Sequence, residues 1–159
     1  MPKITRTKEE WKKILPPENF HVLIEKGTEP PFTGKFSKNK KEGVYMCAGC
    51  GQELFHWDTK YDSGSGWPSF WTPISLDNVD LKPDTSLEMR RIEVVCSRCG
   101  GHLGHVFDDG PKPTGQRYCI NSLSLDFKEV IHYSTSENPD FRTEVKMNHH
   151  TSNIPDQKI

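Results

Sequence analysis

The first 34 residues alternate between polar and apolar positions in the manner of two short helices. Thr7 and Glu10 fit a capping box, in which each side chain accepts a hydrogen bond from the backbone N–H of the other residue. Apolar side chains then recur at three- and four-residue intervals, and the pair Pro16-Pro17 divides them into two stretches before Gly27. These side chains are Trp11, Ile14, Leu15, Phe20, Leu23 and Ile24. The pattern predicts a helical segment over residues 1–34 that packs on a larger body.

From about Phe36 the apolar residues come in short runs separated by Gly, Pro, Asp and Asn, which is typical of strands joined by turns. We predict strands at 44–46 and 87–95 and within 118–127. The composition agrees, because a single alanine, Ala48, against 12 glycines and 12 prolines disfavours a helical bundle. The sequence therefore predicts a mainly β domain over residues 35–133.

The residues after about Ser134 are mostly polar, and we predict a flexible C-terminal tail over 134–159. This tail contains the pair His149-His150. Adjacent histidines can bind a metal, but we interpret this pair as part of a solvated tail.

The charge and the N-terminus narrow the range of functions. The chain has 21 basic and 22 acidic residues and a net charge of -1, so it has no electrostatic basis for binding nucleic acid or an anionic membrane. Residues 1–6 contain no apolar signal region, and no apolar run is long enough to span a bilayer. We therefore expect a cytoplasmic protein, in which an even set of cysteines more often binds metal than forms disulfides.

Four of the five cysteines form two Cys-x-x-Cys-Gly motifs, Cys47-Ala48-Gly49-Cys50-Gly51 and Cys96-Ser97-Arg98-Cys99-Gly100. Two residues between thiolates let both sulfur atoms reach one ion, and the glycine eases the turn around it. The motifs predict one structural zinc ion held by Cys47, Cys50, Cys96 and Cys99, although iron also accepts four thiolates. The long loop between the motifs adds under ~1 kcal/mol of closure entropy, against roughly 10–16 kcal/mol from structural zinc in peptides.

Three other interpretations of these cysteines compete with the four-thiolate site. The motifs can be redox dithiols, or they can form disulfides. The third is a ligand set of Cys96, Cys99, His102 and His105, which leaves Cys47 and Cys50 without a role.

The fifth cysteine lies in the segment Arg117-Tyr118-Cys119-Ile120-Asn121. In an extended chain, alternation puts Arg117, Cys119 and Asn121 on one face. A guanidinium beside a thiol favours the thiolate and lowers its pKa, and an amide can donate to an oxygen near the sulfur. The segment therefore indicates a nucleophile, with a buried structural cysteine as the alternative.

His102 and His105 lie among three glycines in the segment 100–107, so we predict an irregular, exposed turn that presents both rings. Histidine is well suited to proton transfer near neutral pH, although both rings can instead cap turns. Asp109 can orient a histidine or pair with Arg117.

A run of Gly and Ser leads into aromatic residues at 63–71. Aromatic side chains are ordinarily core, and we assign Phe70 or Trp71 to it. Trp67 directly follows Gly66 and is the better candidate for the wall of a binding pocket.

These motifs, in this order, resemble the methionine-(R)-sulfoxide reductases, the B type. The resemblance covers about residues 7–130. The matching segments are Thr28–Gly34, the two Cys-x-x-Cys-Gly motifs, Gly66–Phe70, Gly101–Phe107, Asp109–Pro111 and Arg117–Ser122. The resemblance implies the family's fold, which has two antiparallel β-sheets, small N-terminal helices and a zinc site far from the active cysteine.

The resemblance also implies a mechanism for reducing methionine-(R)-sulfoxide, in proteins or free. Cys119 attacks the sulfoxide sulfur as a thiolate and ends as a sulfenic acid. Arg117 lowers the pKa of Cys119, and Asp109 holds Arg117. The remaining residues act on the substrate: His102, His105 and Asn121 bind and protonate the sulfoxide oxygen, and Trp67 packs on the terminal methyl group and helps select one epimer.

Ser65 departs from the family pattern, since many members carry a resolving cysteine at this position. A serine cannot form the disulfide, and thiolates held on zinc are poor substitutes. We therefore predict that an external thiol reduces the sulfenic acid: thioredoxin, a glutaredoxin with glutathione, or a small thiol.

Two interpretations from other classes stay open at this point. A zinc-ribbon module that binds nucleic acid or protein would account for the two cysteine motifs, but it leaves Cys119 unexplained. A zinc hydrolase or deaminase needs an open metal position, which four thiolates close, and the deaminase His-x-Glu motif is absent.

Overall fold

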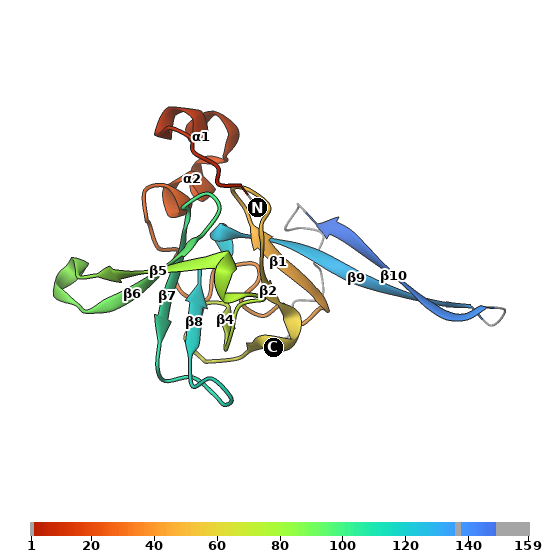
Figure 1. Ribbon diagram of the computed structural model, residues 1–159. Coiled ribbons are helices and arrows are strands. Elements are labelled where there is room, and N and C mark those ends of the chain that lie inside the picture. Colours follow the sequence, from red (N-terminus) through yellow and green to blue (C-terminus); the bar gives the residue numbers. More distant parts are fainter. Residues whose placement is uncertain (1, 136–137, 149–159) are drawn as a thin grey trace.

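The computed structural model describes residues 2–135 and 138–148, and their side chains as far as residue 131. Two antiparallel β-sheets form the body, and two short helices pack at one end of it (Figure 1). The predicted class, mainly β with two antiparallel sheets and short N-terminal helices, is confirmed. The helices are α1 (Lys8–Ile14) and α2 (Pro17–Leu23).

The first sheet has four strands in the order β10-β9-β1-β2, and the second has six in the order β3-β4-β8-β7-β6-β5. The strands of the first sheet are β1 (Gly43–Cys47), β2 (Glu53–His56), β9 (Leu125–Thr135) and β10 (Asn138–Asn148). Those of the second are β3 (Lys60–Tyr61), β4 (Ser69–Phe70), β5 (Val79–Asp84), β6 (Arg91–Cys96), β7 (His102–Phe107) and β8 (Arg117–Ile120). Short 3-10 helices lie at Trp57–Thr59, Leu76–Asn78, Ser86–Glu88 and Ser122–Ser124.

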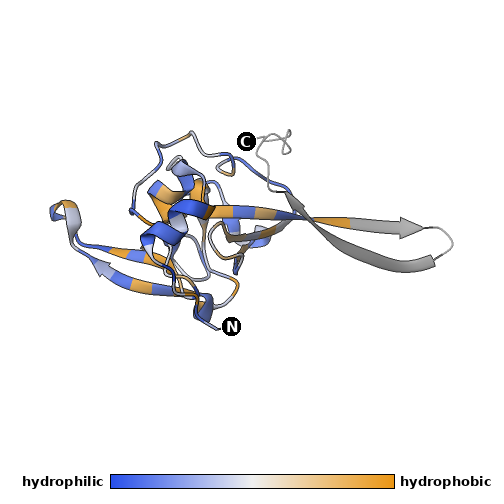
Figure 2. Ribbon diagram, turned by 90° about the horizontal axis from the view of Figure 1, so that it is seen from above, coloured by the Kyte–Doolittle hydropathy of each residue, from blue (hydrophilic) through white to orange (hydrophobic). Residues whose placement is uncertain are grey.

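The core lies between the two sheets and is built largely from aromatic rings. Phe55 of β2 stacks on Phe70 of β4 with ring centroids 4.3 Å apart, and Tyr45 of β1 meets Phe70 edge-on at 5.2 Å. Both contacts join one sheet to the other, so burial of these rings holds the sheets together. Hydrophobic and hydrophilic residues alternate along β9 (Figure 2), as expected for a strand that turns one face toward the core.

Both N-terminal helices form where the sequence predicts them. The side chain of Thr7 accepts from the Glu10 N–H at 3.2 Å, and the Glu10 side chain accepts from the Thr7 N–H at 2.9 Å, which completes the capping box. Pro17 begins α2, and Leu23 buries its side chain in the core. None of the helices in the described ranges has the length and apolar character needed to cross a bilayer.

The structure corrects the strand predictions in two places. Strand β6 begins at Arg91 rather than at residue 87, because Leu87 and Glu88 have left-handed backbones with φ of 57° and 56°. The predicted segment 118–127 is interrupted at Ser122–Ser124 and supplies β8 to one sheet and β9 to the other. The strand predicted at 44–46 lies within β1.

The histidine segment is also different from the prediction. Residues His102–Phe107 form the regular strand β7 and not an irregular exposed turn, and both imidazoles are buried. Gly104 lets the backbones of β7 and β8 approach each other closely and does not serve as a flexible hinge. A Cβ at this position would lie 2.0 Å from the carbonyl oxygen of Cys119.

The predicted flexible tail begins in a region whose backbone is strand. Strand β10 pairs with β9 over residues 138–148, whereas the pair His149-His150 lies outside the described residues. Strand pairing does not measure mobility, so the flexible tail and the division at residues 34 and 133 stay predictions.

We predict that Gly104→Ala destabilises the protein by about 3 kcal/mol, because the new methyl group meets the backbone of β8, which cannot yield as a side chain can. Urea unfolding measures the change. Gly49→Ala is the matched control: its Cβ would lie 3.4 Å from the Trp11 ring, an ordinary contact, and should cost under about 1 kcal/mol. Equal losses in the two variants would contradict this account of Gly104.

Candidate active site and four-cysteine cluster

A row of directly paired residues crosses the second sheet and defines the candidate active site. Tyr61 of β3 pairs with Ser69 of β4, which pairs with Cys119 of β8; Cys119 pairs with His105 of β7, which pairs with Glu93 of β6. Directly opposite residues in antiparallel strands have their side chains on the same face. The register thus brings the thiol and an imidazole together from separate strands.

A cavity of about 280 Å³ opens beside the Cys119 thiol. Five of the residues predicted to act at the site line it: Trp67, His105, Arg117, Cys119 and Asn121. The other lining residues are Thr28, Ser65, Arg91, Gly104 and Phe107. The predicted alternation of Arg117, Cys119 and Asn121 therefore brings all three to the cavity.

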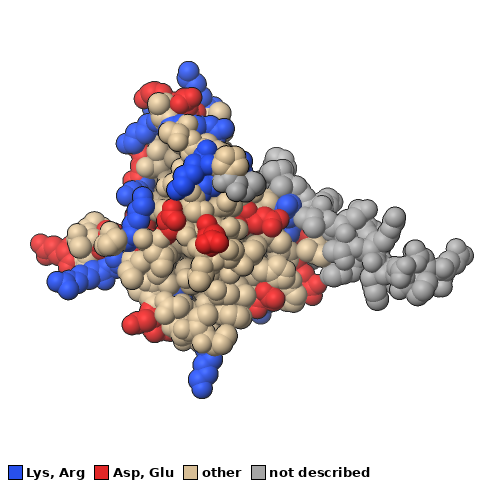
Figure 3. Space-filling view, in the orientation of Figure 1, with Lys and Arg blue, Asp and Glu red and all other residues tan. Residues whose placement is uncertain are grey.

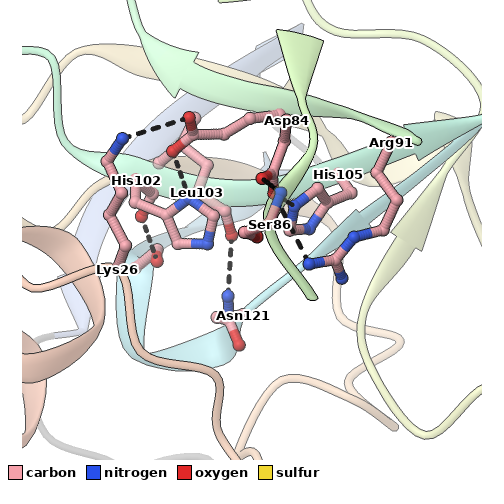
Figure 4. Close-up of polar contacts among 10 residues, drawn as sticks. Lys26, Asp84, Ser86, Arg91, His102, Leu103, His105 and Asn121 are labelled. Carbon is pink, nitrogen blue, oxygen red and sulfur yellow. Dashed lines mark hydrogen bonds and ion pairs between the residues drawn. The ribbon is translucent and has the colours of Figure 1, made fainter. Parts of the chain in front are cut away.

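Each histidine is held by a carboxylate (Figure 4). Nε2 of His105 lies 2.7 Å from Oδ2 of Asp84, and Nδ1 of His102 lies 2.6 Å from Oε2 of Glu93. A ring nitrogen that faces a carboxylate donates its proton to it, so these contacts fix the tautomer of each ring. The remaining ring nitrogen is Nδ1 in His105 and Nε2 in His102.

The two histidines differ in access to the cavity. His105 lines it, whereas His102 does not and is only 3% exposed. The two rings meet edge-on with centroids 5.4 Å apart. Burial lowers the pKa of His102, although Glu93 opposes this effect, so the ring favours its neutral form.

Asp84 remains an ionised carboxylate at and around neutral pH. Hydrogen bonds from Ser86, and then the contact with His105, hold the pKa of Asp84 well below its usual value. Nη2 of Arg91 lies 3.4 Å from the same carboxylate. The Asp84 carboxylate therefore lies between two basic side chains, His105 and Arg91.

The side chain of Asn121 is fixed at both ends. Its Nδ2 donates to the Leu103 carbonyl at 3.1 Å, and its Oδ1 accepts from the Glu29 N–H at 3.1 Å. These bonds determine which way the amide points, and they leave one of its two N–H protons free of the bond to Leu103.

Arg117 pairs with Asp109, one of the two partners predicted for that aspartate. Nε and Nη2 of Arg117 donate to the two carboxylate oxygens at 2.8 and 3.2 Å. The guanidinium also lies over the Phe107 ring, 4.4 Å from its centroid. The forked pair and the ring hold the guanidinium at the rim of the cavity.

The Cys119 thiol is less acidic than its neighbours alone imply. Burial raises the pKa of Cys119, and the nearby charge of Glu29 adds to this, while the Ser65 hydroxyl and Arg117 act in the opposite direction. Arg117 therefore acts in the predicted direction, but desolvation of the thiolate outweighs it and the net shift is upward.

Ser65 lies beside the thiol, with its Oγ 3.9 Å from Sγ of Cys119. The same hydroxyl accepts from the Trp67 N–H at 3.4 Å. Ser65, the residue that departs from the family pattern, therefore lies beside the candidate nucleophile Cys119.

Glu29 organises one side of the site and was not among the predicted site residues. Its backbone carbonyl accepts from the indole N–H of Trp67 at 3.0 Å, and its N–H holds Asn121. Its buried carboxylate accepts from the Leu123 N–H at 2.9 Å, and burial raises its pKa. Glu29 thus orients two residues of the cavity through its backbone.

The four remaining cysteines converge at the turns of two hairpins, one from each sheet. Cys47 ends β1 and Cys96 ends β6, and their sulfur atoms and those of Cys50 and Cys99 all lie within 4.8 Å of one another. Gly51 and Gly100 close the turns with φ of 81° and 77°, as the motif predicts. Among the described residues the group that could hold a metal ion contains these four cysteines and neither His102 nor His105, which favours the four-thiolate site over the alternative ligand set. The four sulfur atoms can hold one metal ion.

The sequence did not reveal Asp84, Glu93 or Glu29 as site residues, because each acts through a contact that forms only when distant segments of the chain fold together. Glu93 carries a detectable signal, since it is an acidic residue inside the apolar strand Arg91–Cys96. Glu29 lies in a segment that the family resemblance includes, but nothing in that segment alone assigns it a partner. Asp84 reaches His105 only because β5 folds back beside β6.

A cavity lined by a thiol, a histidine–carboxylate pair and an aromatic wall is typical of the class of thiol-dependent enzymes. The SelR domain family matches residues 15–129. A peptide methionine sulfoxide reductase MsrB of Methanosarcina barkeri is 66% identical over 125 residues, which cover 79% of this chain and 88% of the relative. The corresponding proteins of Methanosarcina mazei and Leptospira interrogans are 64% and 56% identical, over 79% of this chain and 89% and 96% of theirs.

The chain belongs to the MsrB family of peptide methionine sulfoxide reductases, which are oxidoreductases acting on sulfur. The resemblance noted from the motifs is thereby confirmed. Membership in an enzyme family decides against the zinc-ribbon binding module and the zinc hydrolase.

We predict that Cys119 reacts with iodoacetamide with a pH midpoint above about 8.5, since burial disfavours the thiolate that reacts. Ser65→Ala should move the midpoint higher still, because the hydroxyl favours the thiolate. Mass spectrometry of the labelled peptide against pH measures both, with Cys119→Ser as the unlabelled control. A midpoint below that of a free cysteine in the wild type would refute this electrostatic description.

Proposed function

We propose that the protein reduces methionine-(R)-sulfoxide, in proteins and as the free amino acid, to methionine through a sulfenic acid on Cys119. The observation that carries the proposal is the meeting of Cys119, His105 and Trp67 in one cavity of about 280 Å³. That volume lies near the lower end of ligand pockets and suits a single side chain.

In the proposed complex, the substrate's terminal methyl group packs on Trp67 and its oxygen faces His105 and Asn121. The indole is held by its bond to the Glu29 carbonyl, so the methyl group has a rigid wall. With sulfur facing Cys119 and methyl facing Trp67, only one epimer directs its oxygen to the histidine.

The chemical step moves two electrons from the Cys119 sulfur to the methionine sulfur. The thiolate attacks the sulfoxide sulfur and forms an S–S bond, and the oxygen takes up a proton. The S–O bond of the substrate and the new S–S bond then break as the hydroxyl group passes to the Cys119 sulfur, which leaves the thioether and S–OH on Cys119. The balance is thiol plus sulfoxide giving sulfenic acid plus thioether. In this proposal the proton comes from His105, which lines the cavity and whose ring is held by Asp84 through Nε2.

The other predicted residues assist this step indirectly, by positioning His105 or by contributing charge. His102 packs edge-on against His105 and acts as a positioning residue rather than as the direct proton donor, an assignment supported by its burial away from the cavity. Arg117, held by Asp109, contributes positive charge that opposes the effect of burial on Cys119.

Recycling then uses an external thiol. Two equivalents of reductant thiol, or one dithiol, return Cys119 to the thiol and release water and a disulfide. Candidate reductants are thioredoxin, a glutaredoxin with glutathione, and small thiols. The support is that the residue beside Cys119 is Ser65, and that the other four cysteines lie together in the cluster.

We predict that one turnover on the R epimer of a protected methionine sulfoxide consumes one thiol per methionine formed, while the S epimer gives no product. Ser65→Cys should consume two, because a sulfur at this position can bond to Cys119. Thiol titration after single turnover, with methionine quantified in parallel, measures both. Cys119→Ser should form no methionine.

Loss of two thiols in the wild type would keep the reductase but refute recycling by an external thiol. No methionine from either epimer would refute the proposed function itself.

The four-cysteine cluster holds structural zinc in this proposal. Tetrahedral zinc with sulfur at about 2.3 Å requires sulfur atoms roughly 3.8 Å apart. Sγ of Cys47 lies 3.6 Å from that of Cys99, and Sγ of Cys50 lies 3.5 Å from that of Cys96, so the donor set fits. When bound, zinc contributes to folding and keeps four thiols out of redox chemistry.

We predict close to one equivalent of zinc per chain, and less than half an equivalent with a large drop in melting temperature in Cys99→Ser, because three thiolates hold the ion less tightly. Elemental analysis and thermal unfolding measure these quantities. Cys119→Ser is the matched control and should keep both the metal and the melting temperature. Less than half an equivalent of metal in carefully prepared wild type would contradict a structural metal site.

A further inference from the structure

A second and larger cavity, of about 620 Å³, adjoins the site on the far side of Trp67. Its walls come from two segments, residues 32–41 and 57–67, and Trp67 lines both cavities. We call this cavity the flanking groove. Nothing in the chemistry at Cys119 uses it.

The flanking groove carries net positive charge, because four lysines and two aspartates line it; one of the lysines, Lys41, lies 3.9 Å from Glu129. Lys38 and Lys40 line it, are exposed, and have no carboxylate within 4.0 Å in the described part of the chain. Lys60 lies deeper and donates to the Ser37 carbonyl at 3.0 Å. The two acidic residues of the groove are engaged: Asp58 lies 2.7 Å from the His56 ring, and Asp62 accepts from the Gly64 N–H at 2.9 Å.

The walls of the flanking groove also present apolar surface. Phe32 is 66% exposed, yet its backbone is anchored, because its N–H donates to the Gly66 carbonyl at 2.8 Å. Trp57 and Tyr61 add two more rings. The Tyr61 hydroxyl is buried and has no hydrogen-bond partner in the part of the chain that the structure describes. Apolar walls with basic residues at the rim suit an extended peptide that bears acidic side chains.

The distance between the groove and the thiol matches a short stretch of peptide. Tyr61 is two strands from Cys119 in the paired row, and strands are spaced about 4.8 Å apart, which gives roughly 10 Å. An extended chain covers about 3.3 Å per residue, so a residue two to four positions from the oxidised methionine reaches the groove.

We propose that the flanking groove binds the polypeptide next to the oxidised methionine and favours acidic residues two to four positions away. This inference rests on the proposed function and specifies its substrate class. A free amino acid fills only the cavity at Cys119, whereas an acidic peptide fills both cavities and pairs with Lys38 and Lys40.

The test compares kcat/KM on three substrates of the R epimer. They are N-acetyl methionine sulfoxide amide and two capped nonapeptides with a central methionine sulfoxide, one with glutamates and one with lysines at positions two to four on both sides. We expect the wild type to favour the acidic over the basic peptide by about 2- to 10-fold at low salt, and to lose this preference near 1 M salt.

Charge variants locate the effect. Lys38→Ala with Lys40→Ala should remove the preference, and Lys38→Glu with Lys40→Glu should reverse it, while kcat/KM on the small amide stays unchanged in both. The matched control is Lys12→Ala with Lys13→Ala on α1, which removes the same charge from an exposed site elsewhere and should keep the preference.

The outcomes separate the two proposals. Failure to reduce the small amide would refute the proposed function. Reduction of the amide with equal rates on the two peptides, or a preference that the variants at positions 38 and 40 leave intact, would overturn the flanking groove as a peptide site.

Discussion

Convergence of two hairpin turns on four sulfur atoms is the constraint on which the rest of the architecture depends. One turn comes from β1–β2 and the other from β6–β7, so the cluster brings the two sheets together at one end of the molecule. The N-terminal segment packs on the same place: the Arg98 carbonyl accepts from the Ile4 N–H at 2.7 Å, and the Trp11 ring lies over Gly49. The four-cysteine cluster therefore supplements the small hydrophobic core of this chain at one end of the molecule.

The active cavity depends on the second sheet having one exact alignment of strands. A slip by one residue between β7 and β8 would exchange His105 for a neighbour and turn Cys119 to the opposite face. A register irregularity at Val94/Val95 separates the pairing of Glu93 with His105 from that of Val95 with His102. Basic and acidic side chains are interspersed over the face of the molecule in Figure 3, so that face carries no field of one sign.

Local chemistry made several features predictable from the sequence. The capping box, the turn-closing glycines of the cysteine motifs, and the alternation around Cys119 each depend on residues close together in the chain. The features that were missed depend on contacts between distant segments. Gly104 resembles a loop glycine until β8 lies against it, and Asp84 has no visible partner until β5 folds back. Arg117 lowers the pKa of Cys119 as predicted, but the larger opposing effect of burial cannot be read from a pentapeptide.

The burial of Cys119 has a consequence for its own reactivity toward oxidants. Hydrogen peroxide oxidises thiolates far more readily than thiols. Since burial raises the pKa of Cys119, this cysteine is mostly a neutral thiol at physiological pH, and little thiolate is present to react with peroxide. The same shift that slows formation of the nucleophile therefore protects the idle catalyst from the agent that damages its substrates.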